Sequence, residues 1–261
     1  MGTAIKADDI GIRFYVQHQR QTLHSPLVRL LRREEKPKEF WAFRNVSFEI
    51  PQGSVTGIIG SNGSGKSTLL RTLAGIFVPD EGELEVRGRV SALITLGAGF
   101  QLNLSGLENI FYNGILLGLT RQQVKERLDQ IVEFADLGQF IDAPVRTYSS
   151  GMRARLGFAV AVHVDPELLV VDEVIAVGDA KFRAKCELKF QEFFDKGLTV
   201  VMVQHNLEAI MNMCHDCIWL ERGQLRARGE PKEIVDQYLA SQGLPSIEET
   251  TGAFAAGLDA V

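Results

Sequence analysis

Short apolar runs, each of strand length, recur along this chain between segments of helical periodicity. Residues 55–59, 168–171 and 198–203 are dominated by valine, isoleucine, leucine and methionine, and they carry no charge. Strands of this kind are buried on both faces, as in a parallel sheet that helices cover from both sides. The pattern therefore predicts an α/β fold built on a parallel sheet.

The remaining segments add further elements to this sheet. Residues 107–164 form a long, glycine-punctuated helical stretch, which predicts a helical lobe inserted into the α/β unit. The other predicted elements are strands at 4–16 and 41–50, short strands within 83–94, a hairpin formed by 217–220 and 224–228, and helices at 68–75, 152–164, 181–196 and 231–240. Proline and glycine at positions 51 and 53 mark the turn after the second strand.

Length, charge and hydropathy limit the kind of protein this is. The 261 residues suffice for one large α/β domain, or for a core with a smaller lobe. A formal net charge of −5 gives no support to a nucleic-acid partner. No apolar run reaches the roughly 18 residues of a membrane span, and residues 1–10 lack the apolar region of a signal peptide. We expect a cytosolic or peripherally attached protein.

The three cysteines are Cys186, Cys214 and Cys217, of which the last two form a lone C-x-x-C with His215 inside it. Three is an odd number and too few for a disulfide framework. No second ligand pair with zinc-type spacing accompanies the C-x-x-C. The favoured interpretation is reduced thiols at a junction between a helix and a strand. The alternative, a zinc site, predicts stoichiometric zinc that is lost on Cys217→Ser.

A glycine-rich turn follows the apolar run 55–59 and precedes a predicted helix. It fits the phosphate-loop pattern G-x-x-x-x-G-K-[ST], and its residues are Gly60, Ser61, Asn62, Gly63, Ser64, Gly65, Lys66 and Ser67, followed by Thr68. Glycines let backbone N–H groups converge on phosphate oxygens without obstruction by Cβ atoms. Lys66 is expected to reach the β- and γ-phosphates, and the Ser67 hydroxyl to hold Mg²⁺. An ordinary glycine turn is the alternative, but the full motif in this context predicts binding of a nucleoside triphosphate.

Two carboxylates stand at the end of the apolar run 168–171. In a nucleotide site, Asp172 would hold Mg²⁺ through its water shell, and Glu173 would orient or activate the water that attacks the γ-phosphate. An acidic pair that caps a strand at the surface is the alternative. The phosphate loop in the same chain favours the nucleotide-site interpretation.

Between the phosphate loop and the acidic strand lies the run Tyr148, Ser149, Ser150, Gly151 and Met152. Small residues at a helix start permit close approach to an anion, toward which the free N–H groups and the helix dipole point. In this order of motifs the chain resembles the ATP-binding subunit of ABC transporters, and the run resembles the ABC signature motif.

The resemblance covers about residues 4–240 and implies a fold. It implies a P-loop NTPase core of the RecA-like type, with an antiparallel β subdomain and an inserted α-helical subdomain. Residues 1–240 would form the ATPase domain, with the helical lobe at about 107–164. Residues 241–261 would be a short tail, rich in small residues and expected to be disordered.

The resemblance also implies roles for single residues. His205 matches the switch histidine that contacts the γ-phosphate, although a histidine at a strand end is also often a core residue. Asp179 matches the loop that joins the halves of an ATPase dimer. Gln101 is the candidate for the glutamine that touches Mg²⁺ and couples to the membrane subunit. Tyr15, or less favourably Phe14, would stack on adenine, with strand packing as the alternative.

Within ABC ATPases the chain resembles the subfamily that exports polysaccharides such as O-antigen, capsule and teichoic acid. The signature with its second serine and its methionine, the run 172–182 and the segment 97–109 carry this likeness. Leu102 and Asn103 stand where the subfamily commonly has a proline–glutamate pair, and the coupling segment is shorter than in many transporters. The role of Gln101 is therefore open.

The segment 20–38 is basic and amphipathic. Ser25 can cap a helix whose first residue is Pro26. Three leucines share one face, and three arginines flank it; these are Leu27, Leu30, Leu31, Arg29, Arg32 and Arg33. We expect this segment to lie against the membrane subunit or lipid headgroups. A short helix folded onto its own domain is the alternative.

Taken together, the resemblance implies an ATP-hydrolysing motor subunit with ATP and Mg²⁺ as its cofactors. It would act as a homodimer on two copies of a membrane permease, at the cytoplasmic face of the cell membrane. Each ATP would lie between one chain's phosphate loop and the other chain's Ser149–Met152 run. The cargo would be a lipid-linked glycan moved outward and selected by the permease or upstream enzymes. The alternatives are export of another large amphipathic substrate, an ABC ATPase acting on DNA or ribosomes, and a regulator that does not hydrolyse ATP.

Overall fold

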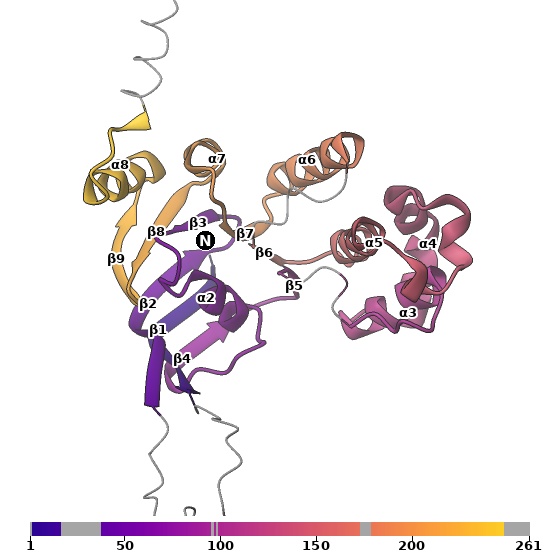
Figure 1. Ribbon diagram of the computed structural model, residues 1–261, viewed down its shortest axis with the longest axis horizontal. Helices are drawn as coiled ribbons and strands as arrows, with labels where there is room; N and C mark the ends of the chain where they lie inside the picture. Colours follow the sequence, from indigo (N-terminus) through magenta and orange to yellow (C-terminus); the bar gives the residue numbers. More distant parts are fainter. Residues whose placement is uncertain (1, 17–37, 95–96, 98, 173–178, 248–261) are drawn as a thin grey trace, which may run out of the picture.

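The computed structural model describes residues 2–16, 38–94, 97, 99–172 and 179–247 (Figure 1). Three sequence predictions therefore fall wholly or mainly outside the described residues. They concern the basic segment before Lys38, the run 173–178 with Glu173, and the tail from residue 248.

Three strands form an antiparallel sheet in the order β2-β1-β4. They are β1 (Thr3–Val16), β2 (Lys38–Pro51) and β4 (Glu81–Val86). In the second half of β2, Val46, Phe48 and Ile50 are buried while Ser47 and Glu49 between them are exposed. This alternation is that of a sheet with one face on the core. The antiparallel β subdomain that the resemblance implied is thus confirmed.

Six strands form a second sheet in the order β5-β6-β7-β3-β8-β9. They are β3 (Val55–Ile59), β5 (Val90–Leu93), β6 (Leu168–Asp172), β7 (Thr199–Val203), β8 (Asp216–Glu221) and β9 (Gln224–Gly229). Neighbours from β5 to β8 run parallel, whereas β9 returns antiparallel to β8. The predicted parallel sheet and the hairpin around Arg222 are confirmed.

Helices and the antiparallel sheet bury the two faces of the parallel sheet. Along β7, Val201 and Val203 belong to the core shared with α2 (Lys66–Leu73) and the antiparallel strands. Val200 and Met202, which alternate with them, belong to the opposite core. The helices on that opposite face are α6 (Ala180–Asp195), α7 (Leu207–Met213) and α8 (Pro231–Ser241). Phe158, Ala161 and Val162 belong to the same core. Burial on both faces explains why the strands are apolar throughout.

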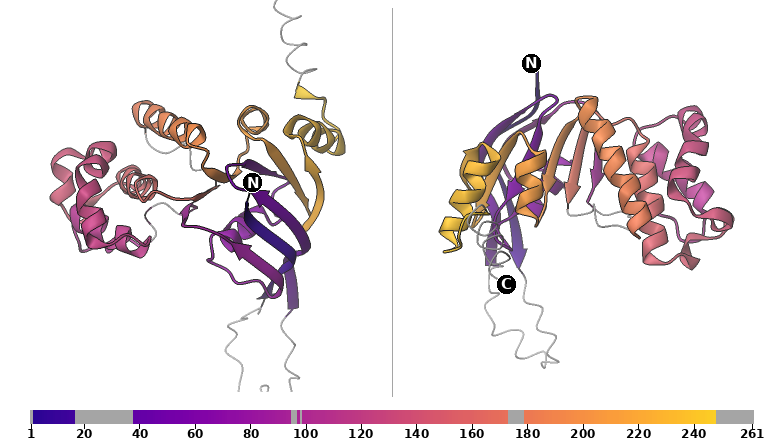
Figure 2. Two further views of the ribbon diagram at one scale, coloured as in Figure 1. Left: turned by 180° about the vertical axis from the view of Figure 1, so that it is seen from behind. Right: turned by 90° about the horizontal axis from the view of Figure 1, so that it is seen from above.

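Three helices stand to one side of the sheets with a core of their own (Figures 1 and 2). They are α3 (Gly106–Leu116), α4 (Arg121–Ala135) and α5 (Ser150–Val162), with short 3-10 turns at Gly138–Asp142 and Val145–Thr147. Ser105 and Thr120 each close a capping box at the start of α3 and α4. Gly118 has a φ of 91° between these two helices, where the sequence predicts a break.

Some elements differ from the prediction at their ends. The helix predicted at 68–75 begins at Lys66, directly after Gly65, whose φ of 103° favours glycine. The seven-residue α7 was not among the predicted elements, because two turns are too short to give a clear period. Residues 242–247, which we expected to belong to the tail, are described, and Ile247 packs against the core on the α6 side.

All three cysteines are buried. Burial raises the pKa of Cys186 and of Cys214 to about 12, and it raises the pKa of Cys217 further. Such thiols stay protonated at neutral pH, as buried structural cysteines do.

None of the helices in the described ranges combines the length and the apolar character that a membrane crossing needs.

Candidate nucleotide-binding site

The ends of three adjacent parallel strands bring the predicted phosphate-site residues to one edge of the sheet. Ile58 of β3 is level with Val203 of β7, and Val203 is level with Asp172 at the end of β6. The phosphate loop leaves β3 at this edge, and His205 follows β7 here. Neighbouring strands lie about 4.8 Å apart. The backbone therefore groups the loop, Asp172 and His205 within a few strand spacings, at the carboxyl edge where α/β sheets bind ligands.

The phosphate loop requires glycine at two of its positions, because a Cβ at either one would clash with a backbone carbonyl oxygen of a neighbouring strand. Gly60 has a φ of 145°, and a Cβ there would lie 2.0 Å from the carbonyl oxygen of Leu220. Gly65 has a φ of 103°, and a Cβ there would lie 2.5 Å from the carbonyl oxygen of Ala42. Only glycine lets this loop lie so close to the neighbouring strands.

Gly63 offers a matched control within the same loop. It also has a positive φ, 79°, but nothing lies within 4 Å of a Cβ built on it. We expect Gly63→Ala to lower the unfolding free energy by about 1–3 kcal/mol of backbone strain and to displace the loop less than Gly60→Ala does. Gly60→Ala must move the loop and is expected to lose nucleotide binding. Titration with a fluorescent ATP analogue compares the two, and equal affinities would contradict this account of the loop.

Lys66 is 9% exposed, and its side chain folds back onto the phosphate loop. Its Nζ donates hydrogen bonds to the carbonyl oxygens of Gly60 at 2.7 Å and Ser61 at 2.9 Å. The ammonium is thus held at the loop, where it can face a phosphate group. Ser67 and Thr68 follow it in the first turn of α2 and are half-buried.

The buried hydroxyl of Ser64 indicates whether the phosphate loop is suited to a bound phosphate. Its side chain is 2% exposed, and within the described part of the chain its Oγ has no hydrogen-bond partner. A buried unpaired hydroxyl is unfavourable unless a ligand or water completes it. Together with the glycines and Lys66, this fits a loop built to receive a polar group.

A cavity of about 420 Å³ extends from the phosphate loop to the C-terminal part of the chain. Gly60, Lys66, Gln204 and His205 line one side of it. Tyr238 and Leu239 of α8, with Gln242 and Leu244 after the helix, line the other. The sequence does not predict a part for α8 in the site. No local pattern could have indicated it, since α8 lies some 170 residues from the loop in the chain.

The Ser149–Met152 run begins α5 in the helical lobe, away from the phosphate loop (Figures 1 and 2). Ser149 caps this helix by accepting a hydrogen bond from the Met152 backbone N–H at 3.1 Å. Ser149 and Ser150 are exposed, and among the described residues a Cβ placed on Gly151 would meet only the Ser149 Oγ, at 3.8 Å. Tyr148 is buried instead, and its hydroxyl donates to the carbonyl of Phe140 at 2.5 Å. The chain therefore presents an open helix start anchored by a buried tyrosine.

Gln101 lies in the segment before α3 and is held through its backbone. Asn109, which is fully buried, accepts from the Gln101 N–H at 2.8 Å and donates to the Gln101 carbonyl at 3.0 Å. The Gln101 side chain is left exposed. Nothing in the sequence pattern singles out Asn109 within 97–109, because its part is a contact from the first turn of α3 back to the segment before the helix.

Tyr15 and Phe14 point to opposite faces of the β1–β2 ribbon, as neighbours in a strand do. Arg13 stacks over the Tyr15 ring, with 5.1 Å between the guanidinium carbon and the ring centroid. Phe14 instead meets Phe77, just beyond α2, edge to face at 5.7 Å between centroids. The two rings thus have different surroundings, and Tyr15, at 53%, is more exposed than Phe14, at 38%.

Asp179 caps α6 by accepting a hydrogen bond from the Phe182 N–H at 2.9 Å. Its other carboxylate oxygen lies 3.7 Å from Arg155 of α5. Glu173, the predicted catalytic base, lies outside the described residues, directly after Asp172.

The comparison with known families decides the assignment of the chain. Residues 43–176 match the family described as ABC transporter. The chain belongs to this family. Membership implies that the phosphate loop binds ATP, and it confirms the resemblance drawn from the sequence.

Curated relatives in the family are similar over most of this chain. The O-antigen export system ATP-binding protein RfbB of Myxococcus xanthus is 48% identical over 220 residues, 83% of this chain and 50% of that protein. The RfbB protein of Klebsiella pneumoniae is 43% identical over 78% of this chain and 82% of its own length. The teichoic acids export ATP-binding protein TagH of Bacillus cereus is 47% identical over 81% of this chain. The chain spans only 38% of that TagH protein and half of the Myxococcus protein.

Solved structures agree with the fold. A dimeric ABC transporter cassette, MJ0796, superposes with a TM-score of 0.68 at 20% identity, covering 87% of this chain and 98% of that one. A structure described as the ATP-binding subunit of an ABC transporter gives a TM-score of 0.70 at 18% identity, covering 97% of this chain and all of that one. At these identities the likeness concerns the fold alone, and it confirms the predicted P-loop NTPase class.

Proposed function

We propose that this chain is the ATP-hydrolysing subunit of an exporter that moves a lipid-linked glycan outward across the cytoplasmic membrane. The observation that carries the proposal is the common edge of β3, β7 and β6. There the phosphate loop, His205 and Asp172 meet on adjacent strands. The names of the relatives, O-antigen export and teichoic acid export, support glycan as the class of cargo.

The residues at the carboxyl edge of β3, β7 and β6 would have different roles in phosphoryl transfer. Lys66 offers a positive charge beside the loop, where negative charge on the leaving phosphates must be balanced. Ser67 and Asp172, with Gln101, supply oxygen ligands of the kind Mg²⁺ prefers. Mg²⁺ there would neutralise charge on the triphosphate. Glu173 and His205 would orient the attacking water and contact the γ-phosphate.

A second copy of the chain completes the site in this proposal. The exposed Ser149 and Ser150 lie on the helical lobe, apart from the phosphate loop of the same chain (Figure 2). An open helix start with small residues suits an anion. The lobe of one chain would therefore cover the nucleotide of the other, together with Gly151, Met152 and Asp179. The dimeric form of the MJ0796 cassette supports this arrangement.

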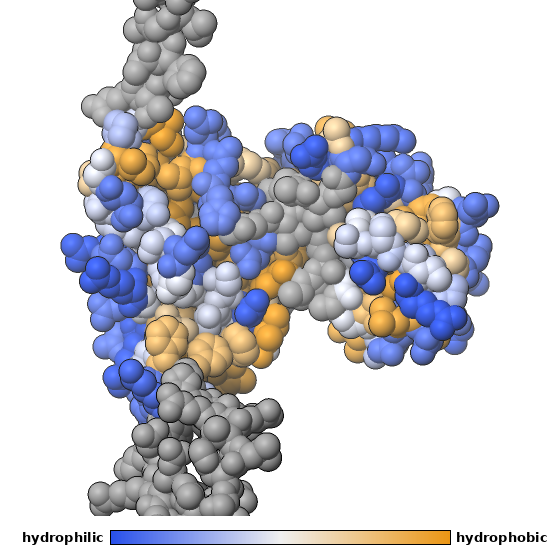
Figure 3. Space-filling model, viewed as in Figure 1, coloured by the Kyte–Doolittle hydropathy of each residue, from blue (hydrophilic) through white to orange (hydrophobic). Residues whose placement is uncertain are grey.

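The helical lobe also offers a surface for a permease. Apolar side chains reach the surface of this lobe (Figure 3). Tyr112, Ile115 and Leu116 of α3 are 39%, 49% and 63% exposed, and Leu102 beside Gln101 is 52% exposed. Tyr112 stands three and four positions before Ile115 and Leu116, so these three are neighbours on the surface of α3. Adjacent exposed apolar side chains are typical of interaction sites. We infer that the lobe docks on a membrane permease, which would hold the chain peripherally at the cytoplasmic face.

Alanine at Phe14 and at Tyr15 distinguishes the two candidates for the adenine-stacking ring. Because the Phe14 ring packs on Phe77 while Tyr15 is the more exposed ring, we expect Tyr15→Ala to raise the KM for ATP by roughly tenfold, which is the scale of one base–aromatic stack. Phe14→Ala should leave the KM nearly unchanged. Steady-state hydrolysis at varied ATP measures both values. The reverse order would make Phe14 the stacking ring.

The export of glycan is tested in the native host. Cells that carry only a Lys66→Ala chain should accumulate lipid-linked glycan on the cytoplasmic side of the membrane and lose the same polymer from the surface. Cells with the unmodified chain at the same expression level serve as the control. If hydrolysis is lost while both glycan pools stay unchanged, glycan is the wrong cargo. Another large amphipathic substrate then becomes the favoured alternative.

A further inference from the structure

Arg155 lies on α5, about one and a half turns beyond Ser150, and it joins three separate pieces of the chain. Its side chain is only 17% exposed. Its Nε donates to the carbonyl of Ala135 at 3.0 Å, and its Nη2 donates to the carbonyl of Asp136. These carbonyls belong to the C-terminus of α4, whose last carbonyl groups have no partner inside the helix. Arg155 therefore fixes α5 to the end of α4.

The same guanidinium reaches the start of α6. Nη1 of Arg155 lies 3.7 Å from Oδ2 of Asp179, while Oδ1 of Asp179 caps α6. The Arg155 guanidinium also lies over the Phe182 ring, 5.2 Å from its centroid. One planar group thus holds the end of α4, the helix that begins with Ser150, and the cap of α6. Arginine is suited to this because its five donors point in fixed directions.

Lysines of α6 reinforce the connection at the same point. Lys181 and Lys185 lie 3.4 and 3.9 Å from Oδ2 of Asp136, and Arg155 lies 3.6 Å from it. The hydrogen bond from Lys181, with the charges of Lys185 and Arg155, lowers the pKa of Asp136. The Asp136 carboxylate therefore stays charged at neutral pH.

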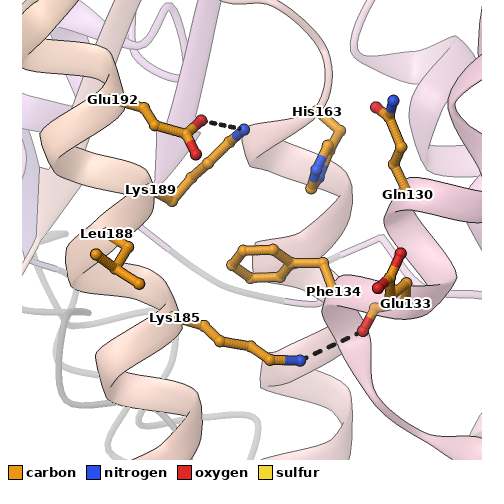
Figure 4. A pocket seen from close by; sticks show the side chains of 8 residues that line it. All are labelled: Gln130, Glu133, Phe134, His163, Lys185, Leu188, Lys189 and Glu192. Atoms are coloured by element: carbon orange, nitrogen blue, oxygen red, sulfur yellow. Dashed lines mark hydrogen bonds and ion pairs between the residues drawn. The ribbon is translucent and has the colours of Figure 1, made fainter.

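Farther along α6, the packing between α4 and α6 is open. The two helices flank a hollow of about 460 Å³, with His163 at its edge (Figure 4). Within it, Lys185 crosses from α6 toward the backbone carbonyl of Glu133 at 3.4 Å. Phe134 also meets Phe182 edge to face at 5.6 Å. The polar contacts between the lobe and the start of α6 thus centre on Arg155 and Asp136, and Lys185 adds the contact with the Glu133 carbonyl.

We propose that Arg155 is a positioning residue that makes the Ser149–Ser150 helix start and Asp179 move as one body. This rests on the proposed function, in which both groups face the nucleotide bound by the partner chain. Arg155 touches neither the phosphate loop nor Asp172, so its effect is on the site of the other chain. Hydrolysis should then depend on Arg155 more than ATP binding does.

Arg155→Lys keeps the positive charge and removes the planar guanidinium that joins the end of α4, α5 and the cap of α6. The expected result is a fall in kcat of about tenfold or more with little change in the KM for ATP, because misplaced groups cost rate rather than binding. Arg127→Lys is the matched control. Arg127 is a half-buried arginine of the same lobe. It donates to the Gln123 carbonyl and pairs with Asp165, and neither partner belongs to α6 or its cap. It should lose comparable thermal stability and keep its kcat.

Asp179→Asn keeps the cap of α6 and removes the charge that faces Arg155. Since both single variants break the same link, the double variant Arg155→Lys/Asp179→Asn should lower kcat no further than the worse single one. Fully additive effects on kcat, or a fall for Arg155→Lys no larger than for Arg127→Lys, would overturn the proposal. If the unmodified chain itself hydrolyses no ATP, the proposed function fails. That result differs from a selective loss in the Arg155 variant.

Discussion

Replacement of Lys66 by alanine is expected to lower kcat for ATP hydrolysis by at least about 100-fold, the scale for loss of one electrostatic partner of the transition state. The ammonium is held at the phosphate loop by the carbonyls of Gly60 and Ser61. No other lysine or arginine is among the residues of the described chain that line the cavity at this loop. Phosphate release from the purified chain measures the loss.

The control for Lys66→Ala must separate lost chemistry from lost folding. Lys66 is buried at the start of α2, so its truncation could loosen the loop. Lys66→Met keeps the apolar stem and removes the ammonium with its hydrogen bonds to Gly60 and Ser61. Both variants should unfold near the temperature of the unmodified chain and both should lose hydrolysis. Substantial activity in Lys66→Met would mean that the charge is not what the site uses.

The second large effect is expected at Glu173. Glu173→Gln keeps the size and polarity of the side chain and removes a base, so kcat should fall by about 100- to 10,000-fold. ATP binding should persist, because Lys66 and the phosphate loop are unchanged. In the proposed mechanism, the two chains separate only after the ATP between them is hydrolysed. We therefore expect the variant to elute as a dimer in ATP and as a monomer in ADP.

Two further variants make the dimer measurement specific. Glu173→Gln combined with Lys66→Ala should elute as a monomer in ATP, since binding is lost. Glu173→Gln combined with Ser150→Arg should also stay monomeric, because a long side chain would block the open helix start of α5. A trapped dimer that survives Ser150→Arg would place the contact between chains elsewhere.

Much of the fold could be predicted because its strands are defined locally. Val55–Ile59 is observed with the bounds that were predicted, since five buried residues stand between the turn at Gly53 and the phosphate loop. The order of phosphate loop, signature and acidic strand was also sufficient to indicate the family.

The choice between Tyr15 and Phe14 shows where local pattern fails. Alternation along a strand assigns each residue to a face only while the register is unbroken. β1 has several register shifts against β2, including one between Ile12 and Arg13. Each bulge changes which face the following residues occupy. Counting from the buried Ile5 could not therefore tell which face each ring occupies.

Other features of the site depend on contacts between distant segments. Arg155 meets Asp179 across 24 positions of the chain, and α8 reaches the cavity beside Lys66 from much farther away. Such contacts follow from how helices pack on the sheet. They have no signature in hydrophobic period or motif spacing.

The central claim is that two copies of this chain together hydrolyse ATP, and one measurement tests it most directly. The rate of phosphate release per chain is measured over a wide range of chain concentration at saturating ATP and Mg²⁺. The account predicts a rate per chain that rises with concentration to a plateau, while Lys66→Ala stays at background throughout. A rate at background, or one that stays constant where sedimentation shows only monomers, would contradict it.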